Sequence, residues 1–142
     1  MYMEIWMFYA LGAAGFAALV GIFGKLGMSG IDSTLGTAVR ALVMAGFLVF
    51  AAIALGKWKL IGTLDSKAFL WITLSGIAGA LSWLCYFYAL KYGKASSVAA
   101  IDKTSVALVL IFAVLFLGEA LTWKNGLGSV FMVVGAVLMI LK

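Results

Sequence analysis

Four polar residues stand in a row inside an otherwise apolar stretch of this chain: Asp102, Lys103, Thr104 and Ser105. The next charged residue after them is Glu119. A carboxylate beside an ammonium group can form an ion pair or bind a polar solute, and a carboxylate can also bind and release a proton. The two hydroxyl groups can donate and accept hydrogen bonds. This run is the first candidate site in the sequence.

Three more residues carry chemistry that fits the same site. Arg40 brings a guanidinium group, while Trp83 and Tyr86 are three residues apart and therefore share one face of a helix. Aromatic rings at this spacing can stack on an apolar or ring-shaped part of a ligand. The chain has no histidine and a single cysteine, Cys85. We therefore expect no metal site, no cofactor and no enzymatic activity.

The composition indicates where these residues must work. Hydrophobic residues make up 66% of the chain and charged residues 11%, whereas about a quarter of the residues in a soluble domain are charged. Most charges fall at the borders of long apolar runs, as in chains that cross a bilayer several times. The sequence therefore predicts a multi-pass membrane protein. The net charge of +5 is no argument for nucleic acid binding.

The apolar runs divide the chain into membrane-spanning helices of about twenty residues, enough to cross a hydrocarbon core of roughly 30 Å. The connections between them are too short to hold a soluble domain. We expect one transmembrane domain over residues 1–142, an all-α bundle of five helices. The predicted spans are residues 5–23, 35–55, 68–90, 98–117 and 126–141.

The candidate residues come to similar depths when these spans are measured along the helix axis. At 1.5 Å per residue, Arg40 lies roughly 10 Å from the membrane face that carries the loop at residues 24–34. By the same measure Asp102 and Lys103 lie roughly 8 to 12 Å from that face, and Tyr86 and Trp83 roughly 9 and 14 Å. Charged side chains at these depths normally face protein or water. We call these five residues the polar layer.

Two interpretations of the polar layer stay open. Arg40 and Asp102 could form an internal ion pair that fixes the packing of the second and fourth spans, with the aromatic residues as ordinary core. Lys103 would then reach the membrane surface, find another partner or face a cavity, because neighbours on a helix point about 100° apart. Alternatively, the layer lines a binding cavity, and Ser105 adds a hydroxyl group to it.

Several stretches of the sequence resemble a known family. FGKLGMSGIDSTLGTAVRA, ALSWLCYFYALKYGKASSVAAIDKTS and LFLGEALTWKNGLGSVFMVVGAVLMIL are similar to the EamA-type proteins of the drug/metabolite transporter superfamily. The resemblance covers essentially the whole chain, and it is closest to the half-size members with five spans. It implies one half of the inverted repeat of five plus five spans that the full-size members contain. Proline, which often bends spans in the relatives, is absent here.

The resemblance implies a secondary transporter of a small organic metabolite or drug in the cytoplasmic (inner) membrane. Arg40 and Lys103 would contact polar or anionic groups, Trp83 and Tyr86 would stack on the substrate, and Asp102 would orient Arg40 or titrate. A structural or regulatory membrane subunit is the alternative, in which the same residues only join helices. An ion channel is a third possibility, but the sequence contains no stretch like a selectivity filter.

The number of spans predicts how copies of the chain assemble. With five spans the two termini lie on opposite membrane faces. Four loop lysines fall on one face and four on the other, so the positive-inside rule has little to act on. We therefore expect insertion in both orientations and an antiparallel homodimer that works by alternating access. The lysines are Lys57, Lys59, Lys67 and Lys124 on one face, and Lys25, Lys91, Lys94 and Lys142 on the other.

Overall fold

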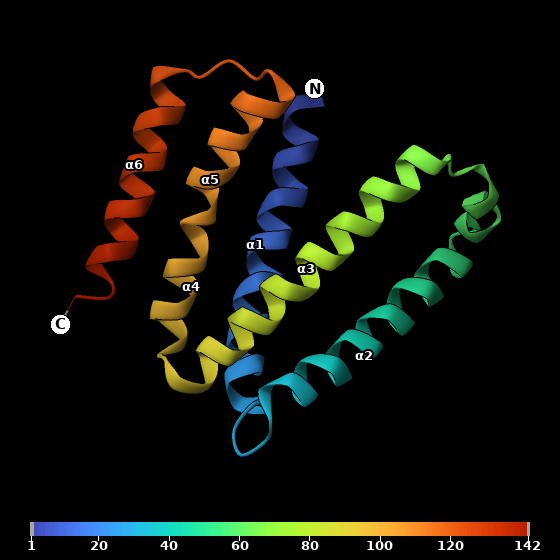
Figure 1. Ribbon diagram of the computed structural model, residues 1–142, viewed down its shortest axis with the longest axis horizontal. Coiled ribbons are helices and arrows are strands. Elements are labelled where there is room, and N and C mark those ends of the chain that lie inside the picture. Colours follow the sequence, from blue (N-terminus) through green and yellow to red (C-terminus); the bar gives the residue numbers. More distant parts are fainter. Residues whose placement is uncertain (1, 142) are drawn as a thin grey trace. The chain divides into compact units, whose positions relative to one another are not determined.

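The computed structural model describes residues 2–141, with side chains from Ile5 to Leu141, and this part of the chain is all-helical (Figure 1). The elements are α1 (Tyr2–Gly27), α2 (Ser33–Ala54), η1 (Lys57–Thr63), α3 (Ser66–Tyr92), α4 (Ala95–Lys103), α5 (Ser105–Phe112), η2 (Ala113–Leu117) and α6 (Trp123–Leu138). Four stretches are long and apolar enough to cross a membrane: Ile5–Gly27, Ser33–Ala54, Ser66–Tyr92 and Ala95–Leu117. The helix Trp123–Leu138 is apolar but shorter. The prediction of an all-α membrane protein is confirmed, and these helices fit a five-helix bundle.

Polar side chains cap the starts of α2, α3 and α6. Asp32 is the N-cap of α2, and its Oδ1 accepts 2.9 Å hydrogen bonds from the backbone amides of Thr34 and Leu35. Asp65 accepts in the same way from the amide of Ala68 in the first turn of α3. Thr122 caps α6. Each cap satisfies amide groups that the first turn of a helix leaves without a partner.

The chain divides into two compact units, and α1 contributes to both. Unit 1 comprises residues 1–23 and 92–142, and unit 2 comprises residues 24–91. In unit 1, α6 packs along both α4 and α5. In unit 2, the long helices α2 and α3 are joined by η1 (Figure 1). A single transmembrane domain over residues 1–142 stays a prediction.

The fourth span is not one regular helix, although the chain contains no proline. It is interrupted at Thr104, whose backbone amide and Oγ1 both donate to the carbonyl of Ile101, at 2.9 and 2.7 Å. The amide of Ala107 in turn bonds the carbonyl of Thr104 at 3.0 Å. These bonds span three residues, the tighter pattern of a 3₁₀ turn, and a threonine hydroxyl that bonds a carbonyl of the preceding turn favours it. The span thus changes its helical pattern without proline.

The same span changes its winding again near its end. Residues Ala113–Leu117 form a π-helical turn, and Gly118 then adopts the left-handed conformation with φ of 69°. The amide of Glu119 closes this turn on the carbonyl of Ala113 at 3.2 Å. Glu119 precedes the Thr122 cap of α6 by three positions, and α6 has no acidic residue in its first turn. Its backbone, rather than its carboxylate, has a structural role here.

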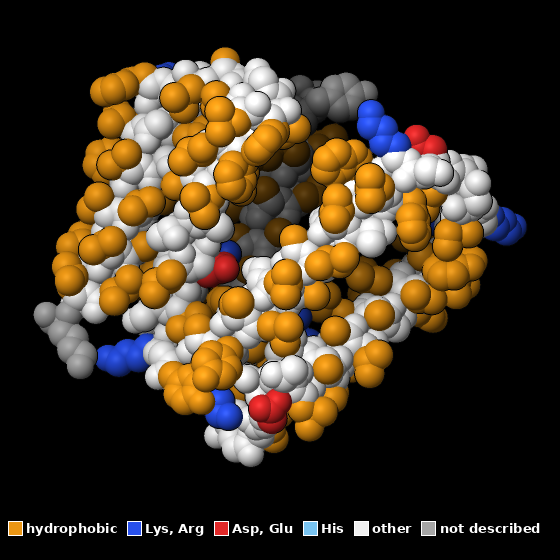
Figure 2. Space-filling view, viewed as in Figure 1, with side chains coloured by type: hydrophobic (Ala, Val, Ile, Leu, Met, Phe, Trp, Pro, Cys, Tyr) orange, Lys and Arg blue, Asp and Glu red, His pale blue; other side chains and the backbone are white. Residues whose placement is uncertain are grey.

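Hydrophobic side chains cover most of the visible helical surface, and charged side chains gather mainly where helices end (Figure 2). Four tryptophans near the ends of the predicted spans are exposed: Trp6, Trp58, Trp71 and Trp123. Surfaces of this kind are stable only against lipid or other apolar helices. Lys142, which enters the count of loop lysines, lies outside the described residues.

Candidate functional site

Three aromatic side chains form a cluster on one face of α3 in unit 2. Trp83 and Phe87 are stacked, with their ring centroids 5.4 Å apart and an angle of 21° between the rings. Tyr86 meets both rings edge-on, with centroids 5.7 Å from Trp83 and 5.6 Å from Phe87. The spacing of three and four residues places these rings on the same side of the helix. We call them the aromatic cluster.

Arg40 of α2 lies against this cluster. Its guanidinium carbon Cζ is 3.8 Å from the centroid of the Trp83 ring and 5.1 Å from that of Phe87. Both distances fall within the range of about 6 Å in which an aromatic ring attracts a cation. The ring of Trp83, which the sequence suggests as a platform for a ligand, therefore contacts the guanidinium group of the protein itself.

Phe87 is held in place by tight packing against the end of α1. Its side chain and that of Leu90 are fully buried. Gly24 leaves room for them, because a Cβ atom at this position would collide with the Phe87 ring. The next residue, Lys25, extends its ammonium group to the carbonyl of Leu90 at 2.6 Å. The contact of α1 with the C-terminal end of α3 thus holds Phe87, one member of the aromatic cluster, in place.

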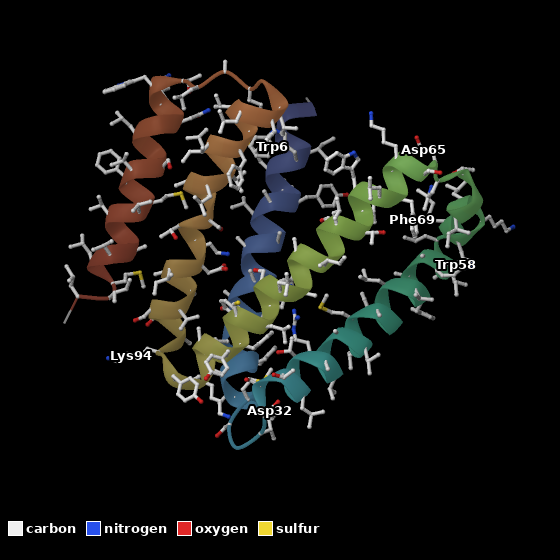
Figure 3. The ribbon with its side chains drawn as sticks, viewed as in Figure 1. Trp6, Asp32, Trp58, Asp65, Phe69 and Lys94 are labelled. Carbon is white, nitrogen blue, oxygen red and sulfur yellow. The ribbon has the colours of Figure 1, made fainter. Side chains whose placement is uncertain are left out.

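The first turns of α2 are packed closely as well. The hydroxyl of Thr37 donates to the carbonyl of Ser33 at 2.7 Å, and both side chains are buried. A Cβ atom on Gly36 would lie 2.5 Å from the sulfur of Met28, which is itself buried. Asp32 lies at the start of this helix (Figure 3), and Arg40 follows eight residues later. These contacts hold the start of the helix that carries Arg40.

Unit 1 carries the remaining charges of the polar layer. Lys103 Nζ is 3.1 Å from Asp102 Oδ2, and the two side chains are 56% and 36% exposed. Because neighbours on a helix point about 100° apart, the two side chains are not expected to share a direction. The long lysine side chain nevertheless curls back to its neighbour, at the point where α4 ends. Ser105 is the first residue of α5, on the other side of the interruption at Thr104.

The structure thus brings some predicted site residues together. Arg40, Trp83 and Tyr86 meet in unit 2, and Asp102 and Lys103 meet in unit 1. The predicted ion pair of Arg40 with Asp102 would join the two units, and it stays a prediction, as does substrate binding by any of these residues. Sequence reasoning missed Phe87 and Gly24. The spacing of four residues from Trp83 to Phe87 could have indicated that Phe87 lies on the same face of the helix. The role of Gly24 depends on the approach of α1 to α3, which no local pattern in the sequence indicates.

Comparison with known proteins places the chain in a family. Residues 4–141 match the EamA-like transporter family. A protein of a Sinorhizobium species, named an uncharacterized transporter in the cobO 3' region, is 42% identical over 136 residues, 96% of each chain. An uncharacterized protein of Methanocaldococcus jannaschii is 30% identical over 92 residues, which are 65% of this chain and 67% of that protein. No solved structure matches the chain.

The family match over residues 4–141 covers the helices that carry both groups of candidate residues. This match and the relative named a transporter, together with the membrane-spanning helices, identify a multi-pass membrane transporter. The chain belongs to the EamA-like transporter family.

Proposed function

We propose that the chain is a secondary transporter of a small organic molecule, and that two antiparallel copies provide alternating access to one site. The observation that carries this proposal is the set of apolar helices in the described residues 2–141. Four are long enough to span a membrane and a fifth is shorter, in a chain that matches a transporter family over residues 4–141. Secondary transporters commonly pair two repeats of opposite orientation around a site at mid-membrane. Two units with five spans form such a pair when they insert in opposite directions.

The interrupted fourth span supports the same function. Local changes of helical pattern inside a helix often mark functional hinges. Here the interruption at Thr104 lies directly after the ion pair of Asp102 and Lys103. Charged residues inside a span also mark substrate and ion pathways. This segment is therefore a candidate for the part of the pathway that changes shape.

Purified protein in liposomes tests transport itself. A gradient of pH or of candidate solutes should drive flux through the natural protein. A structural or regulatory subunit, the alternative function, would produce neither flux nor ligand-dependent stabilisation. Amino acids, sugars, nucleosides and quaternary amines form a suitable first panel, because a thermal-shift measurement in detergent can rank them before flux is measured.

Cysteine accessibility in cells tests the antiparallel arrangement. Cys85, which is exposed, is first replaced, and single cysteines are then placed at the exposed positions Ser29 and Ser66. Ser29 precedes α2, and Ser66 is the first residue of α3. A single span, α2, separates the two positions, so each chain should carry them on opposite membrane faces. Dual insertion predicts that each reporter is labelled from both sides of the membrane. Labelling from one side only, or cross-links between parallel copies only, would show a fixed topology instead.

A further inference from the structure

The charged residues of the polar layer have different contacts in the two units. In unit 1, Asp102 and Lys103 pair with each other at 3.1 Å. In unit 2, the charged residue of the layer is Arg40. Its guanidinium group forms no hydrogen bond or ion pair with any other residue in the described part of unit 2, where the contacts it makes are those with Trp83 and Phe87.

No carboxylate of unit 2, all of whose residues the structure describes, is placed to neutralise Arg40. The acidic residues of this unit are Asp32 and Asp65. Asp32 is the N-cap of α2, and its Oδ1 is engaged by the amides of Thr34 and Leu35. Asp65 caps α3 at the opposite end of that helix from Trp83. An arginine within a membrane span normally has a counter-charge, because bringing a cation out of water is costly.

The contact with the aromatic rings leaves the binding edge of the guanidinium group unused. A ring attracts the cation through its face, whereas hydrogen bonds leave a guanidinium group in its own plane. An arginine stacked in this way is therefore oriented but still has its N–H donors to offer. Two of these donors match the two oxygens of a carboxylate or of a phosphate group.

We propose that Arg40, oriented by Trp83 and Phe87, binds the oxyanion group of an organic anion, and that the transported solute carries a carboxylate. This inference rests on the proposed transport function and names its substrate class. Trp83 acts on the solute through Arg40, as a positioning residue. Tyr86, which is half-buried beside this contact, favours a solute whose carboxylate is attached to an apolar or aromatic part.

Fluorescence of Trp83 measures this binding without any transport. Trp6, Trp58, Trp71 and Trp123 are replaced by phenylalanine, so that emission reports the ring in contact with Arg40. The probes are three carboxylates, each with its neutral amide: acetate and acetamide, succinate and succinamide, benzoate and benzamide. The protein is held in phosphatidylcholine nanodiscs. We expect a saturable change of emission with benzoate, at least tenfold weaker binding of benzamide, and weaker responses to the smaller carboxylates.

Two variants distinguish the guanidinium fork from a simple positive charge. Arg40→Lys keeps the charge but loses the planar pair of donors, and it should weaken benzoate binding at least tenfold. Lys59→Gln removes a cation from η1 and should leave binding unchanged. Circular dichroism and gel filtration establish that both variants are folded. Equal affinity for every carboxylate and its amide, or unchanged binding by folded Arg40→Lys, would overturn the proposal.

The phosphate of an anionic lipid has the same chemistry, and a change of lipid separates the two sources. If phosphatidylglycerol alone changes Trp83 emission and abolishes the response to benzoate, Arg40 binds a lipid headgroup and the substrate assignment is wrong. The proposed transport function fails separately, when liposomes show no flux of any solute. If neutral solutes are transported but no carboxylate binds, the proposed transport function holds and the carboxylate assignment is wrong.

Discussion

The position of Arg40 in the sequence indicates its depth in the membrane but not the partner of its side chain. Its distance from the start of α2 indicates an intramembrane charge, and a carboxylate is the natural partner to expect. In unit 2 the guanidinium group instead meets two aromatic rings, at 3.8 and 5.1 Å. Cation–π attraction is worth about 0.5 to 2 kcal/mol, less than the cost of an uncompensated charge deep in a bilayer.

Removing the ring of Trp83 should therefore destabilise the contact of α2 with α3. We expect Trp83→Ala to lower the free energy of unfolding by about 2 kcal/mol, because it removes both the ring contacts and the cation–π interaction. Trp83→Phe should lose less than half of that. Thermal unfolding in detergent measures the difference. The control is Trp71→Ala on the same helix, where the side chain is 62% exposed; an equal loss there would contradict a specific role of Trp83.

Gly24 allows the close approach of α1 to Phe87. A methyl group at this position would collide with the ring of a fully buried phenylalanine, which has little room to move. We expect Gly24→Ala to destabilise the protein by about 1 to 3 kcal/mol through overpacking. Gly27→Ala is the matched control in the same helix, because a methyl group there would have no other atom within 4 Å. It should be neutral or slightly stabilising, since alanine favours helix, and chemical denaturation compares the two.

Among the elements, the fourth span has some features that could be predicted from the sequence and others that could not. Its length, its apolar character and the polar run at residues 102–105 inside it were evident in the sequence. The interruption at Thr104 was not, because the same residues are compatible with a continuous helix. The contact of Gly24 with Phe87 likewise depends on how two distant segments meet. Local propensity determines the elements, whereas their irregularities depend on hydrogen bonds and packing in three dimensions.

The interruption at Thr104 can be tested with one hydroxyl group. Thr104→Val keeps the shape of the side chain but removes the donor to the carbonyl of Ile101, 2.7 Å away. We expect the span to become more regular, and flux in liposomes to fall at least threefold while thermal stability changes by less than about 1 kcal/mol. Thr73→Val is the control, because Thr73 makes a similar 2.8 Å bond to the carbonyl of Phe69 within a continuous helix. Equal flux in both variants would exclude a role for the interruption in transport.

At the scale of the whole molecule, the loop lysines lie where they can influence the direction in which the chain inserts into the membrane. Lys57 and Lys59 lie on η1, and Lys67 and Lys124 lie in the first turns of α3 and α6. Lys25 and Lys91 lie in the last turns of α1 and α3, and Lys94 is the N-cap residue of α4. These cations stand at helix ends, where they can act as topology signals. A small change of charge at the loops should therefore determine the direction of insertion.

Complementary charge variants test whether both orientations are needed in one working assembly. Lys57→Gln with Lys59→Gln leaves two loop lysines against four, and Lys94→Gln with Leu64→Lys gives five against three, so the two variants are biased by the same amount in opposite directions. The membrane face that carries more lysines is retained in the cytoplasm. Each variant alone should then insert in one orientation and show less than a tenth of the natural flux.

Co-expression of the two variants should restore flux, because it supplies both halves of the antiparallel pair. Lys57→Arg with Lys59→Arg keeps every charge and should transport like the natural chain. Single cysteines at Ser29 and Ser66 verify the orientation of each variant before flux is compared. If either biased variant transports at the natural rate by itself, one orientation is sufficient, and the site must be completed within parallel copies or within a single chain.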